Sequence, residues 1–536
     1  MNNRVSFNGM MKIANICFLM VLENFALDLG MGLLGAACVL FAWLYMLVFG
    51  GMQNTMAKMI ASRVHNELYG NAGKVYRCLM MYSIVMGTVC AFLMFYFSDA
   101  VSNIFLKNTY GSPLLKLLAV LFFLNAIVDA MNGYYLGMEG DTIPYRITCL
   151  IRILLPFAAG IFLVKGFRDY GIKVSALLKE PLYTNVYASV GAVVVFIICS
   201  AVSLFVFILL IMRSGQNNRP FGDEIRKGID SKRSILHSYF TTSISFLKNT
   251  VIFYTSGLGV TLLYFLIASQ KGITVKVAAA NFGMLTGKFF MLCLFPFLLY
   301  REFVIKEKMK IHTSVNKEEW KNVSLRIHYL LKNSFFILLP PTILLITLAE
   351  PIVKVLFSGD YIVSVKLLRI GGILLFLGGF SYTLDSILCT IKKDKQAFFI
   401  RLIGLVILIL SLVGLLNLLN GSIFCIIYAF LIKYVIEMVL QFLLLKSVIV
   451  LRVEDIIGKL IRVIIALIVP AVVEMCLDYF VLMNIPILFL SILIGYLLYY
   501  IGIFLDKGIT KRDELSLKKS FSYIPIHFIS SKLGLW

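Results

Sequence analysis

The chain has 536 residues, of which 60% are hydrophobic and 15% are charged, and its mean hydropathy is +0.92. A soluble globular protein carries about a quarter charged residues, so this composition excludes that class. The formal net charge of +22 would suggest a nucleic-acid partner in a soluble protein. In a chain this apolar, basic residues instead gather in cytoplasmic loops beside anionic lipid heads, so we expect an all-α polytopic membrane protein without a nucleic-acid partner.

Apolar stretches long enough to cross about 30 Å of hydrocarbon as helices recur along the whole sequence, and we expect about 14 transmembrane helices. The expected limits are 9–29, 34–57, 78–98, 114–136, 143–164, 186–212, 241–267, 279–300, 328–349, 367–389, 397–418, 422–445, 458–478 and 484–505. Lys12, Glu23 and Asp28 interrupt the first of these spans.

The distribution of Lys and Arg predicts the orientation of the spans. With a cytoplasmic N-terminus, most basic residues fall in inner loops, so both termini are expected in the cytoplasm. The loop 165–185 is the exception, since Lys165, Arg168, Lys173 and Lys179 lie outside in this scheme. No loop is long enough for a soluble catalytic domain, and 213–240 and 301–327 are expected to form short surface helices.

An internal repeat organises the spans. Residues 97–124 parallel 348–377: an acidic residue (Asp99, Glu350) and then a tyrosine (Tyr110, Tyr361) precede a long apolar helix. The offset near 250 residues predicts four parts: a six-helix lobe over 1–212, a cytoplasmic linker over 213–240, a second six-helix lobe over 241–446, and two extra helices with a cytoplasmic tail over 447–536. Repeated lobes around a midplane site are typical of transporters.

Three basic residues are candidates for a substrate site. Arg152 lies in the fifth span, the second helix of a helical hairpin that turns before Pro144, and Lys248 and Lys288 lie in the seventh and eighth spans. Each is expected about 10–13 Å from the near membrane face. Together they could bind a diphosphate through charge-assisted hydrogen bonds. Alternatively, each pairs with an acid such as Glu23 or Asp129 and fixes helix packing, or Lys248 snorkels inward.

Three acidic residues are candidates for ion coupling or gating. Glu23 lies on the same side of the first span as Lys12, and it either carries a coupling proton or sodium ion or pairs with Arg152. Asp129 and Asp385 occupy matching helices and are candidates for a hinge or gate contact. Lys433 and Glu437, an i, i+4 pair, are expected to neutralise each other.

The sequence predicts neither a cofactor nor a metal site. The ten cysteines are scattered through apolar segments without a CxxC motif, and the five histidines are equally dispersed. GMLTGK at 283–288 has one residue too few between its glycines and no Ser or Thr after the lysine, so we reject it as a phosphate-binding loop.

Two stretches carry a resemblance to a known family. GMQNTMAKMIASRV (51–64) and YYLGMEGDTIPYRITCLIRI (134–153) resemble segments of stage V sporulation protein B-like and O-antigen flippase proteins. Both groups belong to the multidrug/oligosaccharidyl-lipid/polysaccharide (MOP) exporter superfamily, which includes the MATE drug exporters. The resemblance implies two six-helix lobes, a central cavity, alternating access and a bacterial cytoplasmic membrane.

The resemblance also implies a cargo, an undecaprenyl-diphosphate-linked oligosaccharide or polysaccharide unit flipped between leaflets, with Arg152 matching the hairpin arginine. Fourteen spans favour the branch related to lipid II flippases over twelve-span drug exporters. Lys248 and Asn249 replace the acid expected in span seven, which favours an exopolysaccharide unit over a peptidoglycan precursor. The expected partners are the lipid-linked substrate, membrane lipids and other polysaccharide-assembly proteins, and the chain is expected to be a monomer.

Two alternatives to the flippase stay open: a cation-coupled multidrug antiporter, in which Glu23 is essential, and a membrane polysaccharide polymerase or ligase. The second is disfavoured because such enzymes place catalytic residues in a long outer loop, and 165–185 contains no histidine. A transporter that is not an enzyme is therefore the preferred interpretation.

Overall fold

A computed structural model describes residues 2–107, 109–138, 143–214, 230–449, 453–480 and 484–505 of the protein. Parts of three predicted segments lie outside these ranges: the polar turn of the first hairpin at 139–142, residues 215–229 of the cytoplasmic linker, and the tail after residue 505.

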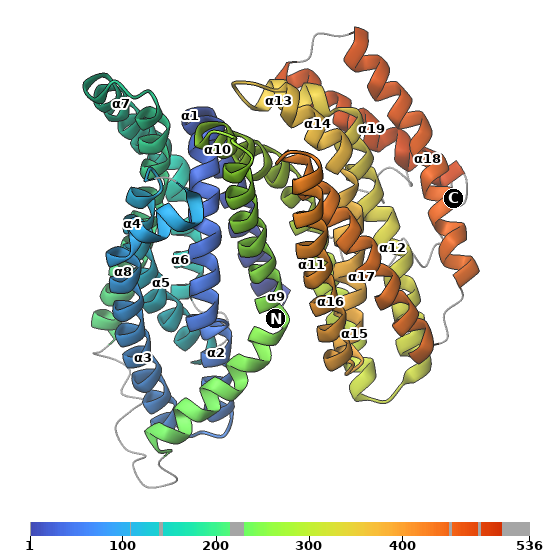
Figure 1. The fold of residues 1–536 in the computed structure, drawn as a ribbon. Coiled ribbons are helices and arrows are strands. Elements are labelled where there is room, and N and C mark those ends of the chain that lie inside the picture. Colours follow the sequence, from blue (N-terminus) through green and yellow to red (C-terminus); the bar gives the residue numbers. More distant parts are fainter. Residues whose placement is uncertain are drawn as a thin grey trace. The chain divides into compact units, whose positions relative to one another are not determined.

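Helices make up nearly all of the described chain (Figure 1). In chain order they are α1 (Asn2–Phe49), α2 (Met52–His65), α3 (Tyr69–Tyr96), α4 (Ser98–Val101), η1 (Ser102–Leu106), α5 (Ser112–Met138), α6 (Ile143–Leu155), η2 (Pro156–Gly160), α7 (Ile161–Leu178), α8 (Leu182–Ser214), α9 (Lys232–Gln270), α10 (Val275–Gly283), η3 (Met284–Phe289), α11 (Phe290–Asn316), α12 (Trp320–Thr347), α13 (Ala349–Leu356), α14 (Ile362–Gly371), α15 (Ile373–Thr390), α16 (Asp394–Leu418), α17 (Phe424–Val448), α18 (Val453–Phe480) and α19 (Ile485–Leu505), where η marks π-helical segments.

Thirteen helical segments of the described residues are long and apolar enough to cross a membrane. The first, Gly9–His65, has 57 residues and would be about 85 Å long as a straight helix, nearly three times the hydrocarbon thickness. Its helical geometry breaks at Leu27, where φ is 54° and ψ is 174°. This segment therefore holds the two predicted spans 9–29 and 34–57, and the other twelve match the remaining predicted spans. The predicted all-α membrane fold is confirmed.

The chain forms two compact units. Unit 1 contains residues 1–287 with 416–422, and unit 2 contains 288–415 with the chain from Ile423 onward. Helices α9 and α10 pack against α1 in unit 1. The predicted lobes over 1–212 and 241–446 follow the sequence repeat, and their boundaries differ from those of the two compact units. The predicted lobe boundaries stay a prediction.

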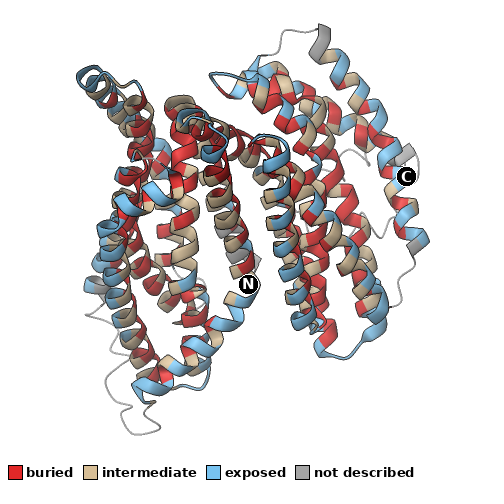
Figure 2. Ribbon diagram, viewed as in Figure 1, coloured by how far each residue is buried: buried red, intermediate tan, exposed pale blue. Residues whose placement is uncertain are grey.

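The two halves of the repeat pack their helices in the same pattern. In unit 1, α5 packs on α2, α3 and α8, and in unit 2 its counterpart α15 packs on α11, α12 and α17. These are the corresponding members of the two sequence halves. Figure 2 shows buried residues along the facing sides of the helices within each unit. The internal repeat seen in the sequence is thus a repeat of packing.

Glycine lets α1 and α10 approach closely within unit 1. A Cβ added at Gly32 would overlap the carbonyl of Ala279, and one added at Gly283 would overlap the carbonyl of Asp28. Small residues at such crossings are the usual means by which membrane helices bring their backbones together. The segment 283–288, rejected above as a phosphate loop, is helical and belongs partly to this contact.

The segment 165–185, expected as an outer loop, is helical. Helix α7 continues to Leu178 and α8 begins at Leu182, so only three residues connect them. Lys179 ends α7 in the left-handed conformation, with φ of 54°, and Pro181 follows. The polar residues at 165–173 were sufficient to end the predicted span, but that stretch contains no proline, and its two glycines, Gly166 and Gly171, are tolerated within α7. Figure 1 shows α7 reaching beyond its neighbours in unit 1.

Candidate functional site

A line of polar side chains runs along one face of α5. Asn125, Asp129 and Asn132 are spaced i, i+4 and i+7, which places them on one side of the helix. We call these three residues the α5 polar stripe. The Tyr45 hydroxyl of α1 donates to Oδ2 of Asp129 at 2.6 Å. The Thr148 hydroxyl of α6 donates to Oδ1 of Asn132 at 3.1 Å.

Arg152 joins the α5 polar stripe from the last turn of α6. Its Nη2 atom donates to Oδ1 of Asn125 at 3.3 Å, and the same oxygen accepts from Ser200 of α8 at 2.8 Å. Arg152 also interacts electrostatically with Asp129. The structure therefore brings together two of the predicted site residues, Arg152 and Asp129, in a cluster to which four helices contribute.

Unit 2 contains the repeat counterpart of this cluster. Arg401 of α16 lies with Nε 3.2 Å from Oδ1 of Asp385 on α15, and their side chains are 12% and 20% exposed. Both hairpins therefore place an arginine near the aspartate of the preceding helix. The pairing differs, since Arg401 contacts its carboxylate directly and Arg152 bonds to a neutral amide.

A second buried polar group of unit 2 lies on α17. Lys433 and Glu437, each at most 5% exposed, are paired at 3.8 Å, which confirms the predicted i, i+4 pair. One turn further along, Gln441 accepts a hydrogen bond from Ser381 of α15 at 3.0 Å. Gly404 of α16 faces Glu437 so closely that an added Cβ would overlap the carboxylate.

The two candidate lysines lie in different surroundings. Lys248 is exposed on α9, just before the candidate span Thr250–Gln270. Lys288 is fully buried in η3, and its Nζ donates to the backbone carbonyl of Asp360 at 3.2 Å. Arg152 and Lys248 belong to unit 1 and Lys288 to unit 2. A joint diphosphate site of the three cations stays a prediction.

Glu23 is fully buried in α1, one turn before the break at Leu27. Its carboxylate fits against Gly287, where an added Cβ would overlap Oε2 and lie 3.1 Å from Cδ. Burial of this carboxylate inside a membrane span keeps the predicted coupling role open without testing it.

The acidic residues of the repeat pair with cations at the expected outer ends of the helices. Hydrogen bonds from Ser112 and Lys116 lower the pKa of Asp99, and Lys116 lies 3.1 Å from its Oδ2. The hydrogen bond from Lys354, at 2.7 Å, lowers the pKa of Glu350. Each half thus has an ion pair at the acidic position that defined the sequence repeat.

Sequence reasoning missed the two asparagines of the α5 polar stripe and Glu474 of α18. The spacing of Asn125, Asp129 and Asn132 in an otherwise apolar helix was the available signal for the stripe. Glu474 lies in an apolar span, and it is 2% exposed.

The arrangement of helices defines the class of fold: a membrane protein built from two repeated helical halves with two additional helices at the C-terminal end. No protein-family model matches the sequence, and no curated protein matches it at the sequence level. The comparison with solved structures does identify the fold.

The structure is similar to that of lipid II flippase MurJ in an inward closed conformation, with a TM-score of 0.57 and 17% identity over 92% of this chain and 97% of that one. It is also similar to an inward-facing multidrug resistance MATE family transporter of the MOP superfamily, with a TM-score of 0.53 and 14% identity over 82% and 95% of the two chains. A ligand complex of the MATE multidrug transporter DinF-BH matches with a TM-score of 0.53 and 15% identity over 82% and 93%. The fold is therefore that of the MOP superfamily transporters, as the sequence resemblance implied.

Proposed function

We propose that this protein is an alternating-access transporter that moves an undecaprenyl-diphosphate-linked oligosaccharide or polysaccharide unit across the bacterial cytoplasmic membrane, with both termini in the cytoplasm. The match to the lipid II flippase covers 92% of the chain, against 82% for the two drug transporters named above. This difference is what we expect if α18 and α19 have counterparts in the flippase. It favours a lipid-linked cargo over a soluble drug.

The hydrogen bonding of Arg152 is the observation that carries the choice of an anionic cargo. A guanidinium has five N–H donors in a fork that fits phosphate oxygens. The bond from Arg152 to the neutral amide of Asn125 uses one of them. An arginine held this way stays in position while its remaining donors bind an anion, whereas Arg401 is already paired with a carboxylate.

A cation-coupled multidrug antiporter is the second candidate, because multidrug transporters share the fold and Glu23 is a fully buried carboxylate. In that case Glu23→Gln should abolish export of a cationic dye such as ethidium, and Arg152 should be dispensable. The two candidates therefore differ in which of the two residues transport requires.

The test is translocation of a fluorescent undecaprenyl-diphosphate oligosaccharide in proteoliposomes, with and without an ion gradient. We expect Arg152→Gln to slow translocation about 10- to 100-fold, since a hydrogen bond between charged groups contributes about 1.5–3 kcal/mol. Lys165→Gln, at an exposed position on α7, is the matched control and should have no effect. Translocation by Arg152→Gln at the wild-type rate would reject the assignment, and ethidium movement by a protein that does not flip lipid would favour the antiporter.

A further inference from the structure

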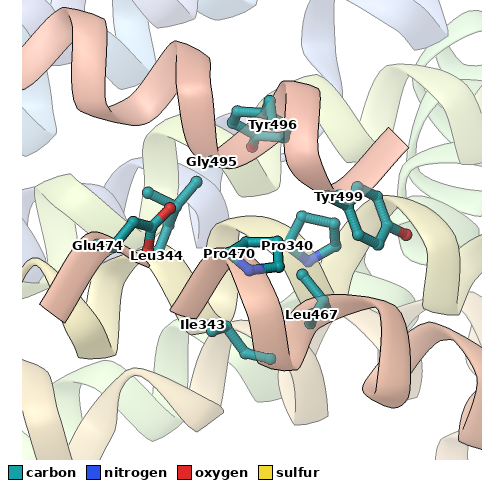
Figure 3. Close-up of a pocket in the computed structure, with 9 residues that line it drawn as sticks. All are labelled: Pro340, Ile343, Leu344, Leu467, Pro470, Glu474, Gly495, Tyr496 and Tyr499. Atoms are coloured by element: carbon teal, nitrogen blue, oxygen red, sulfur yellow. The ribbon is translucent and has the colours of Figure 1, made fainter. Parts of the chain in front are cut away.

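A small cavity lies among α12, α18 and α19 of unit 2 (Figure 3). The residues that line it are Pro340, Ile343, Leu344, Leu467, Pro470, Glu474, Gly495, Tyr496 and Tyr499. About 10 Å³ of it is open to the centre of a water-sized molecule, which is close to the space that one water needs. The cavity is therefore large enough for at most one very small ligand.

Glu474 is the acidic group of this cavity. Glu474 is only 2% exposed, and the Thr347 hydroxyl at the end of α12 donates to its Oε2 at 2.7 Å. On the other side, Gly495 of α19 leaves room for Oε1, since an added Cβ would overlap that oxygen. Figure 3 shows Glu474 next to Leu344 and Gly495. All three helices thus shape the surroundings of one carboxyl group.

The lining provides no positive charge for an ionised Glu474. Among the nine described residues that line the cavity, none is basic. Other acids of unit 2 with little exposure differ, since Glu437 is paired with Lys433, Glu307 with Lys310 and the partly buried Asp385 with Arg401. Transfer of an unpaired carboxylate out of water costs several kcal/mol, and a bound proton removes that cost.

The titratable and charged groups that the structure describes on the surrounding helices do not compensate Glu474 either. On α19 these groups are Tyr496, Tyr499 and Tyr500. On α18 the basic residues Lys459 and Arg462 precede Glu474 by 15 and 12 residues, about 22 and 18 Å along the helix axis. The ion pairs of His328 and Lys332 on α12 with Asp455 on α18, at 3.6 and 3.9 Å, lie at the opposite helix ends, about 22–28 Å away. On α13, Glu350 and Lys354 are bonded to each other at 2.7 Å.

The cavity lies where two helices contain proline. Pro340 and Pro341 interrupt α12, and Pro470 interrupts α18. Proline donates no backbone hydrogen bond, so the carbonyl four residues earlier loses its helical partner. The Tyr499 hydroxyl donates to the Phe336 carbonyl, four residues before Pro340, at 3.0 Å. Polar contacts at Tyr499 and Glu474 therefore fasten α18 and α19 to the interrupted part of α12.

We propose that Glu474 binds one proton in this cavity, and that occupancy by the proton controls how α18 and α19 pack on α12. The neutral carboxyl keeps its hydrogen bond with Thr347, whose hydroxyl also donates to the Ile343 carbonyl at 3.0 Å, and it fits the apolar lining. The ionised form requires water or a cation and loosens the contact. A sodium ion fits less well, because hard cations take several oxygen ligands and the carboxylate and Thr347 provide few.

The direct test is infrared difference spectroscopy of the purified full-length protein across a pH titration. We expect a protonated-carboxyl band that decreases as pH rises and is lost in Glu474→Gln, with choline or sodium as the buffer cation. Glu454→Gln, at an exposed position in the first turn of α18, is the matched control and should retain the band. A protonated-carboxyl spectrum of Glu474→Gln that is unchanged from the wild type, or loss of the Glu474 component when sodium replaces choline, would overturn the proposal.

A second variant keeps the test decisive if Glu474→Gln does not fold. Thr347→Val preserves the carboxyl and removes its donor, so the same band must shift, and an unshifted band would contradict the assignment. A transport readout rests on the proposed function: in proteoliposomes a pH gradient should stimulate the wild type and not Glu474→Gln. If the wild type moves no lipid, the proposed function fails, while the spectra still decide the proton site.

Discussion

Replacing Gly404 by alanine tests a close approach of a helix to a buried carboxylate in unit 2. The added Cβ would overlap Oε1 of Glu437 and lie 2.6 Å from Cδ and 2.7 Å from Cγ, about 1 Å inside normal contact distances. Either α16 and α17 separate or Glu437 leaves its position beside Lys433. Overpacking of this kind costs about 1–3 kcal/mol, so we expect Gly404→Ala to lower the melting temperature by several degrees.

The same helix provides the control for this prediction. Nothing lies within 4 Å of a Cβ added at Gly414 of α16, so Gly414→Ala should be neutral or stabilise by up to about 1 kcal/mol through helix propensity. Thermal unfolding in detergent can be followed with a thiol-reactive fluorophore, because Cys293 and Cys425 are buried. Equal melting temperatures for the two variants would refute the close approach. Glu437→Asp, which shortens the carboxylate side chain by one methylene, should partly rescue Gly404→Ala.

Two further predictions concern ion pairs of unit 2. Asp385→Asn removes the carboxylate that Arg401 contacts and should lower the free energy of unfolding by about 2–3 kcal/mol, somewhat less than for a fully buried pair. If the double mutant with Arg401→Gln loses the sum of the two single effects, the pairing is contradicted. The hydrogen bond from Lys354 lowers the pKa of Glu350. The pair therefore stabilises the folded protein by about 0.5 kcal/mol at this half-exposed site when the pH is above the ordinary pKa of glutamate. This stabilisation is lost as the pH falls through the lowered pKa of Glu350. The melting-temperature difference between wild type and Glu350→Gln should therefore vanish on acidification, and a constant difference would argue against the pair.

The sequence predicted the features that depend on hydrophobic length and on the repeat. The membrane fold, the places of the spans and the correspondence of the two halves follow from apolar runs and from the offset between Asp99 and Glu350. The Lys433–Glu437 pair followed from helical spacing alone. Each of these properties depends on residues that are close in the sequence or on a pattern that recurs along it, so one sequence is enough to predict them.

The features that the sequence did not predict depend on the three-dimensional neighbours of each residue. The extension of α7 to Leu178 was missed because polar composition ends a membrane span without ending a helix. Gly404 and Gly495 leave room for the carboxylates of Glu437 and Glu474, and this role depends on which helix packs opposite each glycine. Glu474 had no sequence partner to mark it, since its donor Thr347 is 127 residues away.

The hairpin arginines show how equal positions in a repeat can acquire different roles. Arg401 lies 3.2 Å from a carboxylate, so binding an anion there would require the pair to break. Arg152 bonds to the amide of Asn125, while the carboxylate of Asp129 accepts from Tyr45. The donors of Arg152 that Asn125 does not use can therefore bind an anion without breaking an ion pair. Under the proposed function, the first half is therefore the one whose hairpin arginine binds the anionic cargo, and the second half uses the same position to hold α15 and α16 together.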